Sequence, residues 1–526
     1  MFASSHIWKK IITVSLFFLF LLSGRAQQGN LPLNFELNQR VALLSTQQDQ
    51  LIHLGARPYQ RINITDELYL WSFEDTSKFY YDLTLLMFKR HALQIEKEDV
   101  FLTADPLFDF AIGRSFEAGN ESSNRIFSNV RGLRVGGDIT SKFSFETFIY
   151  ENQFFYPQYI DSLADARGVA PGIGRSKPFK TTGHDVGMSS GYISLAPTER
   201  MNIQFGHNKF FVGHGYRSLL VSDVAANYPM LKFSLISKNR KWMYHSAKAW
   251  MQSLTRLAFS NSTEALFVRK GGAMNYLSFK PNTKLELGFF ESTIHKNYVD
   301  SIGVIPLDYT FYIPVIGVST LINGLDGANN SLIGVTGSYF LANDMQLYGQ
   351  LAIDKLDKMG WQLGAKWFNP LGMKRSWLLV EVNTVPQYMY TQSKENIYQN
   401  YSHVSQELAH PIGAGFSEVL MHAHWEKNHW YAHLNCNYSL RKRNDGSTQG
   451  ENILLINDDQ DLTHSTEKVK VLYLNLELGY SLNIKTNMQI YLAGTKRTLN
   501  GTISNQSESF VNFGFRTNLR NNYLDI

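Results

Sequence analysis

Residues 471–480 read VLYLNLELGY, and apolar and polar side chains alternate one by one along this stretch. The leucines and Tyr480 share one face of an extended chain, whereas Tyr473, Asn475 and Glu477 share the other. Because successive side chains of a strand point to opposite faces, one face suits lipid and the other suits water. A division of this kind over about ten residues is typical of a transmembrane barrel strand.

The same alternation recurs from Val100 onward. It predicts an all-β protein that forms a transmembrane antiparallel β-barrel of about 18 strands, an even number, as a single-chain barrel requires. We expect strands at 100–113, 130–139, 142–152, 185–196, 200–208, 231–237, 242–255, 269–280, 283–293, 330–341, 344–354, 360–369, 377–384, 416–426, 429–440, 468–481, 487–497 and 510–518. Tight turns alternate with long loops, which belong on the periplasmic and outer sides respectively.

The composition favours a membrane surface over a soluble enzyme. Aromatic residues make up 13% of the 526 residues, charged residues only 18%, and the net charge is +5. Lysines and arginines are spread along the chain, so we expect no nucleic-acid partner. Cys436 is the only cysteine, which excludes an intramolecular disulfide bond and a thiolate zinc cluster.

Residues 1–26 have the pattern of a cleaved secretory signal peptide, with Lys9 and Lys10 before an apolar run and small residues at its end. No later apolar run reaches the length of a membrane helix, so a closed barrel is the remaining way to span a bilayer. We therefore predict export to the outer membrane of a diderm bacterium. Residues 27–98 are expected to form an N-terminal periplasmic segment with some helix, under or against a barrel of residues 99–526.

Residues 206–229, GHNKFFVGHGYRSLLVSDVAANYP, break the alternation and predict an ordered, partly internal segment. We expect Arg217 to be buried inside the barrel, with its five-donor guanidinium bonded to carbonyls or to a carboxylate such as Asp223. A structural role is favoured over binding of a glycan. The candidate ligand-binding or internal residues are His207, Phe211, His214, Tyr216, Arg217, Ser218, Asp223 and Tyr228.

Two further groups of residues could form a metal site or a catalytic site. His422, His424 and His433 fall on predicted lumen faces, where they could ligate zinc, but we favour ordinary polar filling and expect no metal and no cofactor. His214, Ser218 and Asp223 could supply a hydrolytic triad, yet Ser218 lacks the Gly-x-Ser-x-Gly elbow. We therefore expect no enzymatic activity.

Charged side chains predicted to face the lumen suggest a narrow or plugged pore. Glu146, Glu286 and Glu477 are expected to face Lys366 and Arg516 in one transverse network. Such polar filling favours a closed lumen over a wide open channel.

Four runs together resemble the RemB-type gliding motility outer-membrane proteins of Bacteroidota, which in turn look like members of the wider Wzi capsule-assembly family. The runs are HLGARPY (53–59), FGHNKFFVGHGYRSLLVSDVAANYPMLK (205–232), ELAHPIGAGFSE (407–418) and FGFRTNLRNNYLDI (513–526). The resemblance implies an eighteen-stranded barrel with a small periplasmic helical part. For Wzi it implies a lectin that tethers capsular polysaccharide, and for RemB-type proteins a link to gliding.

We therefore expect a non-enzymatic outer-membrane barrel that supports cell-surface polysaccharide attachment or gliding motility. The alternatives are a porin or channel for a small solute and, third, a barrel-embedded hydrolase. The expected partners are outer-membrane lipid, cell-surface polysaccharide, and proteins of the gliding or secretion machinery.

Overall fold

The structure, a computed structural model, describes residues 29–47, 50–64, 91–116, 124–257, 266–325, 327–392, 397–444, 452–454, 466–483, 486–503, 505–517 and 520–526. The predicted signal peptide lies outside these ranges. Among the described residues, no helix is both long enough and apolar enough to cross a membrane.

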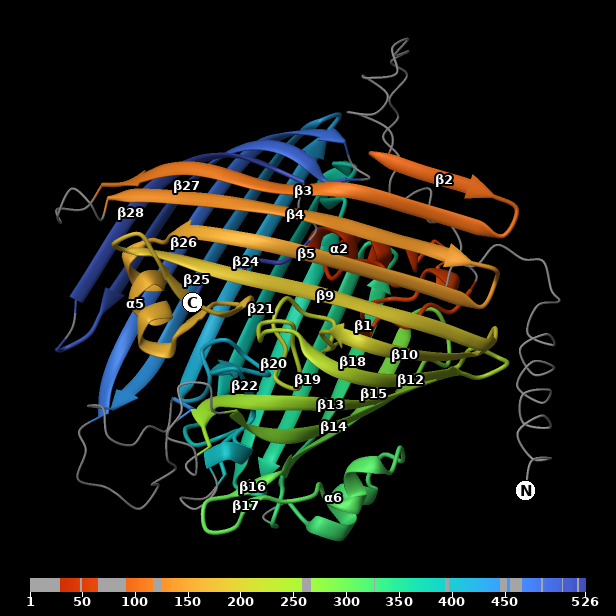
Figure 1. Cartoon of the computed structure of the whole chain (residues 1–526). Coiled ribbons are helices and arrows are strands. Elements are labelled where there is room, and N and C mark those ends of the chain that lie inside the picture. Colours follow the sequence, from red (N-terminus) through yellow and green to blue (C-terminus); the bar gives the residue numbers. More distant parts are fainter. Residues whose placement is uncertain are drawn as a thin grey trace, which may run out of the picture.

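Eighteen antiparallel strands of the described chain form the wall of one closed barrel (Figure 1). Each of the eighteen predicted segments corresponds to one wall strand, so the predicted fold class is confirmed. The wall strands are β3 (Val100–Ser115), β4 (Arg125–Ile139), β5 (Phe143–Phe155), β9 (Gly183–Thr198), β10 (Met201–Asn208), β12 (Tyr228–Ile236), β13 (Trp242–Arg256), β14 (Phe267–Phe279), β15 (Leu285–Lys296), β18 (Asn330–Ala342), β19 (Met345–Lys355), β20 (Lys358–Phe368), β21 (Trp377–Val385), β24 (Phe416–Lys427), β25 (Trp430–Asn444), β26 (Thr466–Asn483), β27 (Met488–Asn500) and β28 (Asn505–Arg516).

The barrel closes between the last strand and the first, because β28 pairs with β3 from Phe510 opposite Ser115 to Arg516 opposite Asp109. β2 (Leu93–Lys97) and β8 (Lys177–Phe179) each pair with one wall strand only, β3 and β9 respectively. The remaining elements are α2 (Phe35–Leu44), β1 (Ala56–Arg57), η2 (Arg61–Asn63), α5 (Gln158–Arg167), β6 (Val169–Ala170), β7 (Gly174–Arg175), β11 (Phe211–Val212), β16 (Tyr298–Val299), β17 (Gly303–Val304), η4 (Tyr309–Tyr312), α6 (Val318–Asn323), η5 (Pro370–Gly372), η6 (Ile397–Gln399), β22 (Ser402–His403) and β23 (Gln406–Glu407).

The side chains of the wall strands divide as the alternation predicts. On β26, Leu476 and Leu478 are about half exposed on the outside, whereas Val471 and Tyr473 are buried on the inside. The outer surface of a transmembrane barrel meets hydrocarbon, and its lumen holds polar groups. The inward polar residues of the wall therefore require partners inside the barrel.

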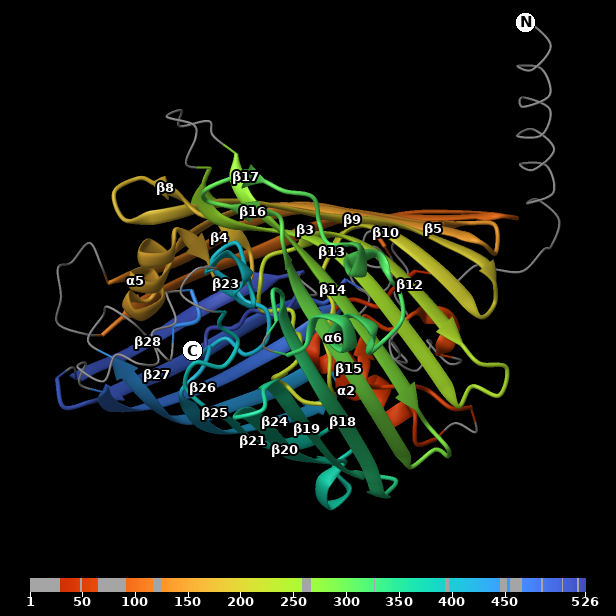
Figure 2. The ribbon, with the colours of Figure 1, turned by 90° about the horizontal axis from the view of Figure 1, so that it is seen from below.

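Many of those partners come from four internal segments, which we define as the described residues within 29–64, 209–227, 386–415 and 520–526. The first contains α2, drawn in red between the wall strands in Figures 1 and 2. Strand β1 of this first segment pairs antiparallel with β11 of the second internal segment. Residues 29–47 and 50–64 of the predicted N-terminal segment thus lie inside the barrel, whereas residues 93–97 form the exposed strand β2 beside β3.

The apolar face of α2 explains this position. The Asn34 carboxamide oxygen caps the helix by accepting from the Leu37 amide at 3.0 Å, and such caps satisfy an otherwise unpaired helix N–H. The ring of Phe35 then packs edge-on against Trp377 of β21 and Tyr216 of the second internal segment. Burial of these apolar faces fixes the helix against the wall.

A further connection, residues 305–323, lies on the outside of the barrel; we call it the outer segment. Its helix α6 sits outside β14 and β15 in both views (Figures 1 and 2). The carboxylate of Glu291, at the middle of β15, accepts from the Gly317 amide at 2.6 Å and the Thr320 amide at 2.9 Å. Lys248 of β13 likewise donates to the Ile313 carbonyl at 2.9 Å. The outer segment thus covers polar side chains that point out of the wall.

Candidate functional site

The barrel lumen contains a cavity of about 310 Å³ between the internal segments and the inner faces of β25 to β28, β3 and β4. Its lining extends from Asn487 and Gln489 near one end of the barrel to Ile126 and Phe510 near the other. Cavities that bind small ligands are usually of about 300–1,000 Å³. Five tyrosines and several amides and carboxylates line it; the tyrosines are Tyr156, Tyr216, Tyr473, Tyr491 and Tyr523.

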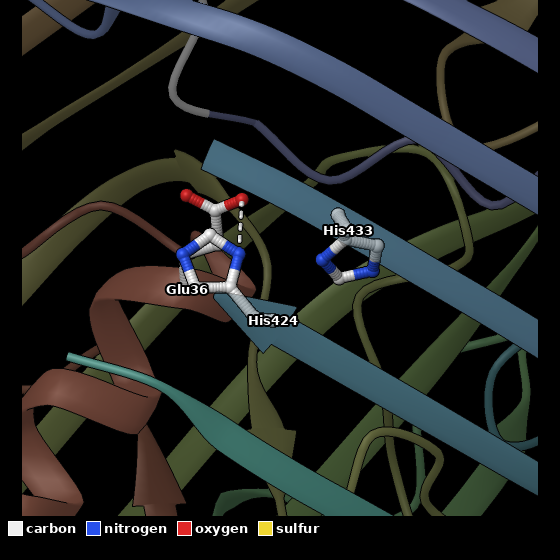
Figure 3. Close-up of side chains that lie close together, drawn as sticks. All are labelled: Glu36, His424 and His433. Carbon is white, nitrogen blue, oxygen red and sulfur yellow. Dashed lines mark ion pairs between the residues drawn. The ribbon is translucent and has the colours of Figure 1, made fainter. Parts of the chain in front are cut away.

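Two of the three predicted lumen histidines, His424 and His433, lie beside Glu36 of α2 (Figure 3), and Glu36 and His433 line this cavity. One potential ligand atom from each of Glu36, His424 and His433 lies within 4.8 Å of the others. His422, on the same face of β24 as His424, instead contacts His433, with 3.1 Å between its Nδ1 and His433 Nε2. Burial acts to raise the pKa of Glu36, but the charges of His424 and His433 outweigh it and lower this pKa.

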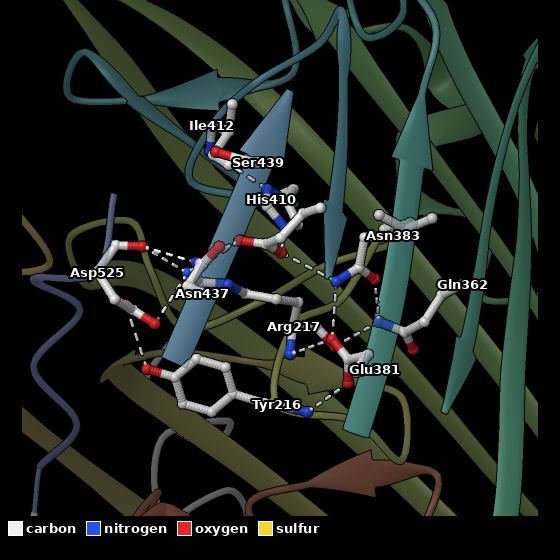
Figure 4. Close-up of polar contacts among 12 residues, drawn as sticks. Tyr216, Arg217, Gln362, Glu381, Asn383, His410, Ile412, Asn437, Ser439 and Asp525 are labelled. Carbon is white, nitrogen blue, oxygen red and sulfur yellow. Dashed lines mark hydrogen bonds and ion pairs between the residues drawn. The ribbon is translucent and has the colours of Figure 1, made fainter. Parts of the chain in front are cut away.

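Arg217 is 1% exposed, in agreement with the prediction that it is buried and bonded inside the barrel. Its guanidinium lies 3.0 Å from the carboxylate of Asp525 and 3.4 Å from that of Glu418 (Figure 4). Burial acts to lower the pKa of Arg217, but the two carboxylates raise it above its usual value. The side chain therefore stays charged and joins the second and fourth internal segments to β24.

The backbone beside Arg217 is held by a second buried carboxylate, that of Glu381 on β21. It accepts from the amide of Tyr216 at 2.9 Å and from that of Arg217 at 3.2 Å (Figure 4). The hydroxyl of Tyr348 donates to the same carboxylate at 2.8 Å. Since buried polar groups are costly unless they are hydrogen-bonded, this bonding specifies one position for the segment.

Asp223, the partner suggested by the sequence for Arg217, has other contacts. Its carboxylate accepts from the hydroxyl of Tyr523 at 2.6 Å and from the amide of Asn521 at 2.9 Å. The predicted Arg217–Asp223 pairing is therefore wrong, because the fourth internal segment supplies partners for both residues.

His214, Ser218 and Asp223 are not assembled into a triad. The hydroxyl of Ser218 donates to the Val212 carbonyl at 2.6 Å, and neither ring nitrogen of His214 has a hydrogen-bond partner among the described residues. Burial lowers the pKa of His214 to about 4, so the ring is neutral at pH 7. The arrangement provides no activated nucleophile.

The other candidates of residues 206–229 divide between the two sides of the wall. Phe211 is buried beneath the guanidinium of Arg57, 3.8 Å from the ring centroid, and Tyr228 is fully buried. His207 is on β10, on the same outward face as the exposed Phe205. Tyr216 is the candidate from this stretch that lines the cavity.

The predicted transverse network is present only in part. Arg516 forms an ion pair with Glu477, whereas Glu146 pairs with Arg134 at 2.7 Å. Glu286 instead accepts from backbone amides of the first internal segment, and Lys366 donates to the His214 carbonyl at 2.6 Å. The network is divided because a neighbouring strand, for Glu146, and the internal segments, for Glu286 and Lys366, provide nearer partners than the opposite wall.

Asp525, Glu381 and Glu418 contact Arg217, although no sequence pattern predicts them as its partners. Glu418 and Asp525 lie within the runs 407–418 and 513–526 that carry the family resemblance, which is the one signal that pointed to them. No regular spacing in the neighbouring sequence identifies such residues as partners of Arg217.

No protein-family model and no curated protein matches the chain. Among solved structures, Wzi, described as an outer membrane protein involved in group 1 capsule assembly in Escherichia coli and a carbohydrate-binding β-barrel, is similar at 12% identity and a TM-score of 0.56. That match covers 93% of this chain and 99% of that chain. OprD of Pseudomonas aeruginosa matches at 8% identity and a TM-score of 0.41, over 79% of this chain and 94% of that chain.

The likeness to Wzi shows the fold of this chain, an outer-membrane type of β-barrel, as the resemblance to the Wzi family predicted. The resemblance to RemB-type gliding proteins stays a prediction.

Proposed function

We propose that the chain is a non-enzymatic outer-membrane barrel that attaches cell-surface polysaccharide, with the lumen cavity contributing a contact for its sugar units. The observation that carries the proposal is the combination of tyrosine rings with amides and carboxylates around one cavity of the lumen. The exposed apolar belt of the wall supports an outer-membrane location, with lipid as the surrounding partner.

The chemistry of the lining suits a glycan. A sugar ring presents C–H groups on its faces and hydroxyls at its edge, so it is matched by aromatic faces beside hydrogen-bonding side chains. In the cavity, the rings of Tyr473 and Tyr491 lie near the amides of Asn435, Asn475 and Asn512. Carbohydrate binding by Wzi, which shares the fold, is consistent with this reading.

Polysaccharide binding tests the proposal directly. The full-length protein in detergent micelles is titrated with extracellular polysaccharide purified from the source cells, and with its oligosaccharide fragments. We expect saturable binding that weakens at least tenfold in Asn475→Ala/Asn512→Ala. Asn202→Ala, which removes a lumen amide outside this cavity, is the matched control. Equal binding by both variants would place the glycan contact elsewhere, and absence of any binding would refute the proposal.

A role in gliding motility is the second part of the proposal, and it rests on the resemblance to RemB-type proteins. A deletion strain is expected to lose retained surface polysaccharide, surface spreading or both. Normal retention and normal spreading would contradict it.

The second candidate function, a channel for a small solute, is favoured by the lining of the cavity between the two ends of the barrel. Single-channel recording in planar bilayers separates the two functions. The attachment proposal expects no steady large conductance, because the internal segments pack against the inner face of the wall. A steady solute-selective conductance would favour the channel.

A further inference from the structure

Glu36, His424 and His433 form a cluster with the composition of a metal site (Figure 3). Glu36 is in the first turn of α2, and the two histidines are register partners on β24 and β25. The potential ligand atoms of all three lie within 4.8 Å of one another, and His424 Nδ1 is 3.9 Å from Glu36 Oε1. The cluster therefore joins an internal helix to two adjacent strands of the wall.

Two imidazole nitrogens of the cluster are buried without a hydrogen-bond partner among the described residues. These are Nδ1 of His424, a residue that is 6% exposed, and Nδ1 of His433. A buried nitrogen without a partner costs free energy. A bound cation would satisfy both nitrogens at once, since the lone pair of a neutral imidazole is a metal ligand.

The opposite nitrogens of the two rings lie beside groups of the kind that orients metal-ligating histidines. His433 Nε2 lies 3.1 Å from His422 Nδ1, which leaves Nδ1 as the ligand atom of His433. His424 Nε2 lies 3.8 Å from the carboxylate of Glu426, which Arg40 holds through a 2.7 Å ion pair. Carboxylates and other acceptors behind the distal nitrogen of a ligand histidine fix its tautomer and raise its basicity.

We propose that Glu36, His424 and His433 bind a divalent transition-metal ion, Zn²⁺, through one carboxylate and two imidazoles. Zn–N and Zn–O bonds are about 2.0–2.2 Å long, so tetrahedral ligand atoms stand about 3.3 Å apart. The ligand atoms lie within 4.8 Å of one another, so each has to move by about 1 Å to reach this spacing. Imidazole and carboxylate ligands suit zinc, and three protein ligands leave a fourth position open.

The open position faces the lumen cavity, because Glu36 and His433 both line it. The metal ion would present its fourth ligand, a water molecule or a group of a bound solute, to that cavity. It would also tie α2 to β24 and β25. This assignment is independent of whether the cavity contacts a glycan.

Metal titration tests the assignment. The full-length protein, folded in detergent and stripped with a chelator, is titrated with Zn²⁺ at pH 7 by calorimetry. We expect one ion per chain, and an affinity reduced at least tenfold in both Glu36→Gln and His424→Gln. His207→Gln, which changes an outward-facing histidine of β10, is the control and is expected to bind like the unchanged protein. Heat-modifiable migration on gels verifies that each variant is folded.

Cobalt spectroscopy keeps the assignment testable even if a variant fails to fold. The stripped, unchanged protein with one equivalent of Co²⁺ is expected to show the intense visible absorption of a four-coordinate site, which Zn²⁺ displaces. Absence of saturable zinc binding in the unchanged protein, or equal affinity in Glu36→Gln, His424→Gln and His207→Gln, would show that these histidines are only polar filling of the lumen.

Discussion

The guanidinium of Arg217 lies 3.0 Å from the carboxylate of Asp525, although 308 residues separate them in the chain. Both side chains are almost completely buried. Their ion pair joins an internal segment from the middle of the chain to the segment at residues 520–526. The position of one internal segment therefore depends on the presence of the other.

Removal of the Arg217 charge is expected to destabilise the barrel strongly. Arg217→Met would leave the carboxylates of Asp525 and Glu418 buried without their cation, at a cost of about 3–5 kcal/mol. Urea unfolding followed by tyrosine and tryptophan fluorescence measures the change. Arg131→Met, which breaks the exposed ion pair with Glu151, is the control and should cost less than about 1 kcal/mol. A similar small loss in both variants would contradict the role assigned to the Arg217 pair.

The first internal segment is expected to loosen when its anchor on β15 is changed. The carboxylate of Glu286 accepts from the amides of Leu54 and Gly55, each at 2.9 Å. Glu286→Gln turns one acceptor into a donor, so we expect a loss of about 3 kcal/mol. Hydrogen exchange of these two amides should accelerate, whereas Glu151→Gln on the exposed surface leaves them protected. Unchanged protection in Glu286→Gln would show that other contacts hold the segment.

The ring of Tyr348 lies so close to the backbone of Gly364 that a side chain at this position is expected to clash. A Cβ at this position would overlap the ring of Tyr348, its register partner on β19. Gly364→Ala is expected to destabilise the barrel by about 1–3 kcal/mol, as overpacking does. Gly494→Ala provides the control, since nothing lies within 4 Å of its Cβ position. The Tm of each variant is measured, and we expect a lower Tm for Gly364→Ala. Equal Tm values for the two variants would contradict the prediction.

Acidification is expected to destabilise the interior through His214. Burial lowers its pKa from 6.5 to about 4, although Glu286 opposes this and Lys366, Lys280 and Arg57 add to it. The unfolded chain therefore takes up a proton between pH 6.5 and 4 that the folded chain does not bind, so stability falls as the pH falls through this range. The contribution is on the order of 1–3 kcal/mol.

The pH dependence is measured as Tm between pH 7.5 and 4. His214→Gln should flatten the decrease, whereas His207→Gln should not. A decrease of the same size in His214→Gln would assign the acid sensitivity to other groups.

The wall of the barrel could be predicted because each strand carries its own period of two. The ends of the strands were less certain, as at β4, which begins at Arg125 and not at residue 130. Near the rim of the barrel, outward side chains lie beyond the hydrocarbon, so a polar residue such as Asn129 is tolerated there. The middle of the strand requires an apolar residue on this face. The alternation therefore weakens before the hydrogen-bonded ladder ends.

Of the contacts inside the barrel, the sequence predicted only that Arg217 is buried. Its partners lie on other segments, and the bond between Gly55 and Glu286 likewise spans 231 residues. Such contacts leave no trace in local spacing. Glu36 was missed as a neighbour of His424 because a helix expected beneath the barrel lies within it.

The outer segment has a consequence for the order of events during insertion. Glu291 and Lys248 point out of the wall and would meet hydrocarbon if β13 to β15 entered the bilayer bare. Each unpaired polar group in that environment costs several kcal/mol. Residues 305–323 must therefore dock before or together with the entry of these strands into the membrane, so this side of the barrel matures as a folded unit while other sides can add strand by strand.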